Sequence, residues 1–255
     1  MRALSLFLVL TCTLSFGAWA AVDDSQAKAD FTKAGELYRA GDYSAAIIAY
    51  EKILDSRLES GALYYNLANS YYRDGQIGEA VLNYERAARL IPRDRDLKYN
   101  DRYLRSRYPD ARPYQDKNIL EKAIDKHIQF YTLDEMAAIL AGLFVVLGLF
   151  VLAAFYGRWA RSPVMTISVL MAAAIGIYAA GFVFKLADIT NKAVVITKAS
   201  ANFEPRSKAT EHFPLPKGAV VKILKEEEGW MKIRRWDGQL GWVSAENIQR
   251  IEKQP

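Results

Sequence analysis

The sequence predicts a multidomain protein with an all-α domain of helical repeats, a two-helix transmembrane hairpin and a small all-β barrel, in that order. Residues 27–60 and 61–94 share one pattern, and residues 193–252 hold several short strand-like segments. Between them, residues 136–157 and 162–184 form two uncharged apolar runs, each longer than the roughly 20 residues that a bilayer-spanning helix needs. A buried hairpin in a soluble core is the alternative, but such cores seldom need two helices that are apolar all round.

The charge of the chain argues against a nucleic-acid ligand. The 255 residues carry a formal net charge of +5, and the basic residues are spread along the chain. We therefore interpret the charge mainly as solvation of the soluble parts.

The first residues resemble a secretory signal. Arg2 precedes an uncharged stretch, and Ala18, Trp19 and Ala20 form the small-x-small pattern of a cleavage site. We expect residues 1–20 to be removed; an uncleaved anchor is the alternative. Because the only cysteine lies in this segment, we expect the mature chain to form no disulfide and no cysteine metal site.

The helical repeat has a period of 34 residues. Its two copies align Gly41 with Gly75, Ala46 with Ala80, and Tyr50 with Tyr84. The glycines permit a tight turn between two helices, and the alanines let those helices approach closely. A third unit begins at Arg95, but Pro109 stands where the turn glycine is expected, so we predict one capping helix and a repeat domain over residues 27–108.

This pattern resembles the tetratricopeptide repeat, whose other signature positions here are Tyr64, Leu67, Ala68, Tyr71, Ala87 and Pro92. The resemblance implies a concave groove lined by the first helix of each pair. The candidate peptide-binding residues are Tyr65, Asn69, Tyr72, Arg73, Tyr99, Asn100, Tyr103 and Arg107. Asparagine amides can hold a peptide backbone, and arginine can pair with a carboxylate.

Asn69 and Asn100 match two asparagines of the family's carboxylate clamp. Tyr65 stands where the clamp has its lysine, which argues against capture of a C-terminal carboxylate. The structural alternative is that the tyrosines pack between helices. We favour peptide or protein binding, since a repeat stack offers a recognition surface and no catalytic pocket.

Residues 116–131 are predicted to form an amphipathic helix on the membrane or against the repeats. Thr132 and Glu135 then form a capping box, so the first span should start near Leu133. Arg158 and Arg161 mark the loop between the spans as cytoplasmic by the positive-inside rule. We therefore expect an inner-membrane protein whose soluble domains lie in the periplasm.

The last region contains four predicted strands, over residues 193–197, 219–225, 230–236 and 239–243, with Asp237 and Gly238 as a hairpin turn. This region resembles a bacterial SH3 domain over residues 193–252. Trp230 occupies the position of the first signature tryptophan of the eukaryotic relatives, whereas Ser244 and Asn247 replace their proline and tyrosine. We take Trp230 and Trp236 as a candidate ligand surface and expect Trp242 to pack in the core.

The order of the parts, with the stretch LYYNLANSYYRDGQIGEAVLNYERAARLIPRDRDLKYN from Leu63, is similar to the BatE-like tetratricopeptide component of the Bat (aerotolerance) family. The resemblance implies von Willebrand factor A domain membrane proteins and a MoxR-type AAA ATPase system as partners. It also implies a role in stress tolerance or envelope protein assembly.

Two functions agree with these patterns. The first, which we favour, is a non-enzymatic inner-membrane scaffold whose repeats bind a partner protein in the periplasm. The alternative is a cell-wall module in which the SH3-like domain binds peptidoglycan stem peptides and the repeats recruit a wall enzyme. The sequence holds no Ser/His/Asp set, no nucleotide loop and only two histidines, His127 and His212, so we expect no catalysis, cofactor or metal.

Overall fold

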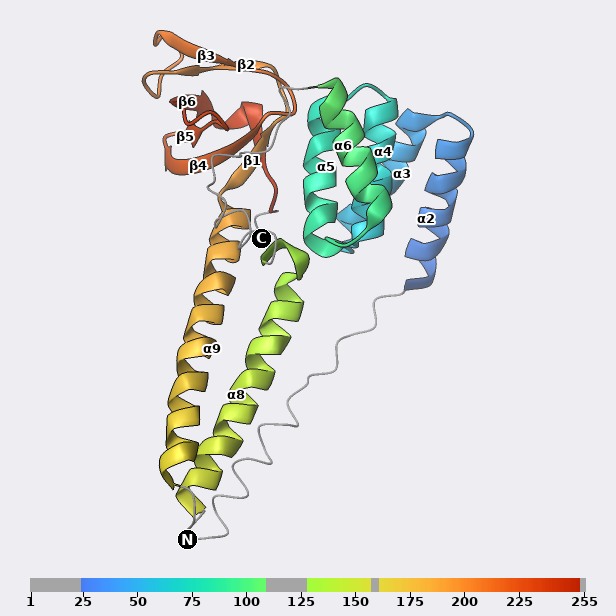
Figure 1. Ribbon diagram of the computed structural model, residues 1–255. Helices are drawn as coiled ribbons and strands as arrows, with labels where there is room; N and C mark the ends of the chain where they lie inside the picture. Colours follow the sequence, from blue (N-terminus) through green and yellow to red (C-terminus); the bar gives the residue numbers. More distant parts are fainter. Residues whose placement is uncertain (1–23, 109–127, 157–160, 253–255) are drawn as a thin grey trace.

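The computed structural model describes residues 24–108, 128–156 and 161–252. The predicted signal segment 1–20, most of the predicted helix 116–131 and most of the arginine-bearing loop 158–161 lie outside these ranges. Figure 1 shows a helical domain and a β-domain side by side, both at the same end of a long helical hairpin. This arrangement agrees with the expectation that the two soluble parts share one side of a membrane.

The helical domain contains α2 (Asp24–Arg39), α3 (Tyr43–Asp55), α4 (Gly61–Arg73), α5 (Ile77–Leu90) and α6 (Arg95–Arg107). Helices α3, α4 and α6 each begin where a short polar side chain accepts a hydrogen bond from a backbone N–H of the first turn. The three caps are Asp42, Ser60 and Asp94. Helix α6 is the first helix of the predicted third unit; the residues that would form a second helix of this unit lie outside the described ranges.

The repeat register is confirmed by the two turns between paired helices. Gly41 and Gly75 both have φ of +84°, a left-handed conformation that favours glycine. The aligned alanines Ala46 and Ala80 are both fully buried. The sequence therefore predicts these turns and helix contacts correctly.

The hairpin consists of α8 (Leu133–Tyr156) and α9 (Arg161–Thr190), which pack side by side (Figure 1). The capping box is confirmed at the start of α8: the backbone N–H of Thr132 donates to Glu135 Oε2 at 2.9 Å, and that of Glu135 donates to Thr132 Oγ1 at 3.1 Å. Both helices are long and apolar enough to cross a membrane. Of the most apolar 18-residue stretch of each helix, only 0% in α8 and 11% in α9 is buried within the protein. At 24 residues α8 is about 36 Å long, enough for a hydrocarbon core of roughly 30 Å.

Helix α9 continues past the predicted end of the second span at Phe184. Lys185 begins this extension, and its ammonium donates to the backbone carbonyls of Ile128, at 2.9 Å, and of Tyr131. The charged side chain thereby obtains partners in the segment that precedes α8. The helix remains regular until Thr190, from which the β-domain follows directly.

The β-domain is one antiparallel sheet in the order β3-β2-β6-β5-β4-β1-β7. Its strands are β1 (Lys192–Val195), β2 (Ala199–Asn202), β3 (Glu211–Leu215), β4 (Val220–Glu227), β5 (Trp230–Arg234), β6 (Leu240–Ser244) and β7 (Ile248–Arg250). The four predicted strands correspond to β1, β4, β5 and β6. The other three are short, and β3 contains a proline, so their local signal is weak.

The predicted two-residue turn at Asp237 and Gly238 is wrong in its length. Strand β5 ends at Arg234 and β6 begins at Leu240, and only Gly238 of the predicted pair has positive φ, at +85°. The Arg235 guanidinium forms an ion pair with Asp237 at 2.5 Å and also bonds Gln239. These side-chain bonds stabilise a longer connection than a two-residue turn.

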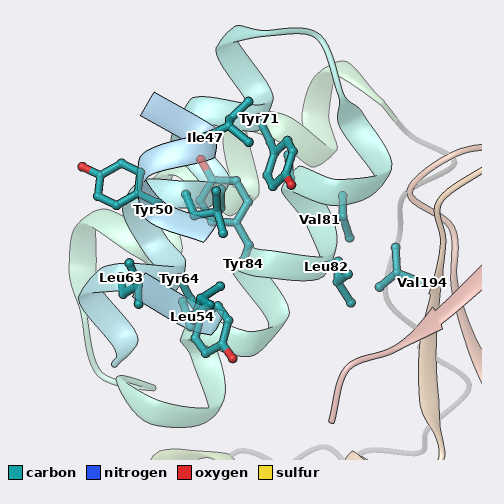
Figure 2. Packing of buried hydrophobic residues seen from close by; sticks show 14 of the residues in the cluster. Ile47, Tyr50, Leu54, Leu63, Tyr64, Tyr71, Val81, Leu82, Tyr84 and Val194 are labelled. Atoms are coloured by element: carbon teal, nitrogen blue, oxygen red, sulfur yellow. The ribbon is translucent and has the colours of Figure 1, made fainter. Parts of the chain in front are cut away.

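The repeat domain and the β-domain pack against each other through α5 and β1. Val194, Val220 and Ile251 belong to the same hydrophobic cluster as the repeat helices, and Figure 2 shows Val194 facing Leu82 of α5. One helical turn earlier on α5, Gly78 lies so close to β1 that a Cβ there would stand 2.9 Å from the Ile196 Cα. Only glycine allows this approach.

Arg86 completes this interface from the same helix. Its side chain is buried, and its guanidinium donates to the backbone carbonyls of Ile251, at 3.0 Å, and Arg250, at 3.3 Å. Burial lowers the pKa of the Arg86 guanidinium, although arginine stays charged at neutral pH. The two carbonyls supply hydrogen bonds that a buried cation requires.

Candidate functional site

The eight candidate residues lie on α4 and α6, the first helix of the second repeat and the capping helix. We call the surface that they form the α4–α6 face; its members are Tyr65, Asn69, Tyr72, Arg73, Tyr99, Asn100, Tyr103 and Arg107. Helix α4 contacts both α2 and α6, so the first helices are neighbours, as the repeat pattern implies.

A hydrogen-bond network joins the middle of this face. Asn69 Oδ1 accepts from the Tyr84 hydroxyl at 2.6 Å and from Asn100 Nδ2 at 3.0 Å. Asn100 Nδ2 also donates to the Tyr65 hydroxyl oxygen at 2.8 Å. The structure therefore brings Tyr65, Asn69 and Asn100 together although α4 and α6 are separate in the sequence.

The sequence analysis missed the part of Tyr84 in this network. Tyr84 is a signature residue of the second helix and reads as a core residue, and it is indeed buried. Its hydroxyl nevertheless reaches back to Asn69 on the first helix. The alignment of Tyr84 with Tyr50 marks a packing position, and nothing in that alignment reveals the hydrogen bond.

The network leaves one acceptor on the α4–α6 face. Among the described residues no partner is found for Asn100 Oδ1, whereas the Asn69 side chain bonds Tyr84, Asn100 and Tyr65. Asn100 is half-buried, so its position is held by the neighbouring side chains. An extended peptide presents backbone N–H groups that can donate to such an oxygen.

Aromatic rings and arginines surround the asparagines. The rings of Tyr72 and Tyr103 meet edge to face with centroids 6.2 Å apart, and the Arg107 guanidinium lies 5.6 Å from the Tyr103 centroid. Arg73 lies 4.8 Å over the ring of Tyr43, at the junction with the first repeat. Of the eight residues, Tyr99 stands apart: it is 68% exposed and makes no ring contact among the described residues.

The phenols of Tyr65 and Tyr72 stay neutral at physiological pH. Burial raises the pKa of Tyr65, and burial with the neighbouring Tyr103 raises the pKa of Tyr72. The hydrogen bond to Tyr103 raises the pKa of Arg107. Because Tyr65 and Tyr72 keep their protons and arginine is charged at neutral pH, the face is cationic and suits a ligand with carboxylates.

In the first repeat, the side chains of the first helix pack within the fold, which agrees with the alternative that aromatic residues pack between helices. Phe31 of α2 packs edge to face on the buried Tyr50, with centroids 5.6 Å apart. The Arg39 guanidinium bonds the backbone carbonyl of Gly35 within the same helix. These side chains serve the fold of α2 and α3, so the candidate site is centred on α4 and α6.

Helix α6 is held in position by a cluster of three charges. Arg105 pairs with Glu85 of α5 at 2.7 Å and with Asp101 of α6 at 2.8 Å, and its side chain is only 12% exposed. Burial tends to lower the pKa of Arg105, but the attraction of Glu85 and Asp101 outweighs it and raises the pKa. The cluster fixes the orientation of the helix that carries Asn100, Tyr103 and Arg107.

The two candidate tryptophans of the β-domain are not in contact. Strand β5 buries Met231 and Ile233 on one face, as the alternation predicts, and places the half-buried Trp230 on the other. Trp236 lies beyond the end of β5, and no ring contact joins it to Trp230 in the described chain.

The expectation that Trp242 packs in the core is wrong. Trp242 is half-buried on the outer face of β6, opposite Lys232 of β5. The ammonium nitrogens of Lys225 and Lys232 lie 6.0 and 5.9 Å from the centroid of its ring, within the range of a cation–π contact. In the alternation of β6, Gly241 and Val243 take the inward positions.

Comparisons with known proteins match two parts of the chain. The tetratricopeptide repeat family matches residues 61–94, which contain α4 and α5, and the bacterial SH3 domain family matches residues 204–249. A comparison with curated proteins finds no match. The protein thus combines a helical tetratricopeptide region, two long apolar helices and a C-terminal antiparallel SH3-like domain, a set of parts suited to binding other proteins or the cell wall.

Proposed function

We propose that this protein is a non-enzymatic scaffold of the bacterial inner membrane whose α4–α6 face binds an extended segment of a partner protein in the periplasm. The observation that carries the proposal is the network of Tyr65, Asn69 and Asn100, which holds the Asn100 carbonyl oxygen as an acceptor on a cationic, aromatic face. The match of residues 61–94 to a protein-binding repeat family supports it.

We further propose that the partners are von Willebrand factor A domain membrane proteins that work with a MoxR-type AAA ATPase system, in stress tolerance or envelope protein assembly. The support for this step is the resemblance in the order of parts to the Bat family. The two apolar helices would hold the scaffold beside membrane-anchored partners.

The α4–α6 face can be tested with Arg73→Ala combined with Arg107→Ala. Both side chains are exposed, so the free energy of unfolding of the double variant should differ from that of the parent protein by no more than about 0.5 kcal/mol. Loss of two charge-assisted contacts should weaken capture of the von Willebrand factor A domain partner by more than about tenfold. The measurement is the yield of that partner after crosslinking in native membranes, with thermal unfolding of the same purified variants.

The matched control is Lys98→Ala, which removes an exposed cation from α6 outside the candidate set. Asn69→Ala is less informative, because it also breaks bonds to Tyr84 and Asn100 and should lower stability. Capture at full yield by a stable Arg73/Arg107 double variant would refute the assignment of the face.

The proposed location predicts the activity of topology reporters. Alkaline phosphatase folds to an active enzyme only outside the cytoplasm, so a fusion after Pro255 should be active and one inserted in the 158–161 loop should be inactive. The reason is that basic residues keep a short loop on the cytoplasmic side. The opposite pattern would place both soluble domains, and every partner, in the cytoplasm.

A second candidate function is recognition of peptidoglycan by the SH3-like domain, favoured by the match of residues 204–249 to bacterial SH3 domains. Co-sedimentation of the full chain with purified peptidoglycan separates the two functions. Sedimentation that Trp230→Ala and Trp236→Ala abolish would favour the wall module.

A further inference from the structure

Two pairs of like charges face each other across strands β4 and β5. Lys222 lies directly opposite Arg234, and Lys225 lies directly opposite Lys232. Like charges in directly opposed positions of an antiparallel pair repel one another and destabilise the sheet. Neither pair is required by the core, because these positions alternate with the buried Val221, Ile223, Met231 and Ile233.

In the described part of the chain, three of these four cations lack a carboxylate in direct contact. Among the described residues no carboxylate forms an ion pair with Lys222, Lys232 or Arg234; only Lys225 has one, with Glu227 at 2.6 Å. The Trp242 ring lies near Lys225 and Lys232, at 6.0 and 5.9 Å from their ammonium groups. We call the surface formed by Lys222, Lys225, Lys232, Arg234 and Trp242 the cationic strip.

We propose that the cationic strip binds an extended acidic segment of a partner protein, with carboxylates at alternate positions. Along β5, Lys232 and Arg234 are two residues apart, a spacing of about 6.6 Å. An extended peptide repeats its side chains on one face at the same interval. Because neighbouring strands are about 4.8 Å apart, each carboxylate meets two cations, Lys222 with Arg234 and then Lys225 with Lys232.

The bound carboxylates offset the repulsion that the empty strip carries. Each one stands between two like charges and turns an unfavourable cross-strand pair into two ion pairs. The Trp242 ring adds an apolar surface at the end of the second row, beside the ligand. The strip is separate from the α4–α6 face, so this proposal goes beyond the function proposed above and can succeed or fail independently of it.

An acidic peptide fits the strip better than an anionic bilayer does. Glu226, Glu227 and Glu228 form the exposed end of β4 and the turn that follows, directly beside the strip. A flat anionic surface that reached the lysines would also meet these carboxylates and be repelled by them. A narrow peptide strand can lie on the cations and avoid the turn.

The test uses the full chain purified in detergent and a fluorescently labelled peptide of alternating glutamate and serine, with affinity measured by anisotropy. Lys232→Gln combined with Arg234→Gln should weaken binding by more than about tenfold, and Lys208→Gln, an exposed cation of the same domain outside the strip, should leave the affinity unchanged. The ligand-free double variant should also melt about 1 to 3 °C higher, because one member of each opposed pair has lost its charge.

Stabilisation together with loss of binding distinguishes a ligand site from a structural role, for which the variant would melt lower. Equal affinity of the double variant and the parent protein for the peptide would overturn the proposal. So would binding to vesicles with anionic lipids, or to purified peptidoglycan, without binding to the peptide.

Discussion

Replacing Arg86 with alanine should detach the SH3-like domain from the repeats and lower the free energy of unfolding by about 3 kcal/mol. The side chain is only 6% exposed, and it satisfies the backbone carbonyls of Arg250 and Ile251. Alanine leaves the buried carbonyl of Ile251 and the partly buried carbonyl of Arg250 without these donors. It also removes the contact of the guanidinium with the Tyr64 ring, 5.7 Å from its centroid.

Amide hydrogen exchange at β1 and β7, with thermal unfolding of the full chain, measures this effect. Arg89→Ala on the same helix is the control, because Arg89 is half-buried and donates no hydrogen bond to the β-domain. Gly78→Val should detach the domain by a different route, since its Cβ would meet backbone atoms of Val195 and Ile196 at 2.9 Å. Unchanged protection of β1 and β7 in both variants would mean that the interface does not hold the domains together.

Replacing Arg105 with methionine should cost about 3 to 5 kcal/mol, because it leaves two carboxylates without their shared cation. Glu85 and Asp101 have side chains only 20% and 30% exposed, so solvent replaces the guanidinium poorly. The change should also weaken partner capture, since α6 carries Asn100, Tyr103 and Arg107.

The loss should depend on pH. Burial already raises the pKa of Asp101 in the folded protein, against the opposing effect of Arg105. Without Arg105 this pKa rises further, so the folded variant binds more protons than its unfolded chain, and its stability falls as pH rises through the folded pKa. The difference in melting temperature from the parent should therefore be smaller near pH 5 than at pH 7.

Arg102→Met is the matched control for this experiment, because it removes an exposed arginine from the same helix. It should change neither the melting temperature nor its pH dependence by a measurable amount. A penalty for Arg105→Met that stays constant with pH would show that the carboxylates remain paired or solvated without it.

Most elements could be predicted because their signals are local. The left-handed turns at Gly41 and Gly75, and the capping box of Thr132 and Glu135, each depend on residues a few positions apart. The bilayer-length helices depend only on the length of an apolar run. The strands β2, β3 and β7 were missed because they are short and β3 contains a proline, so their local signal is weak.

For the candidate site, repeat spacing correctly placed Tyr65, Asn69 and Asn100 on adjoining helices. It could not show that Tyr84 anchors Asn69, or that Tyr99 makes no ring contact with the others. Side-chain partners of this kind depend on the angle between packed helices. That angle is set by the whole core, to which the β-domain contributes Val194 and Val220.

The sequence by itself determined the order of the parts, the repeat register and the length of the two apolar helices, because backbone hydrogen bonding and side-chain periodicity act over short distances in the chain. Only the tertiary structure decided that α5 presents Gly78 and Arg86 to the SH3-like domain, and that Lys222 and Lys225 face Arg234 and Lys232. These contacts join residues far apart in the sequence or depend on strand register. The buried guanidinium of Arg86 meets its carbonyls only after the domains have packed, and the two lysines face opposing cations only in the register that strands β4 and β5 adopt.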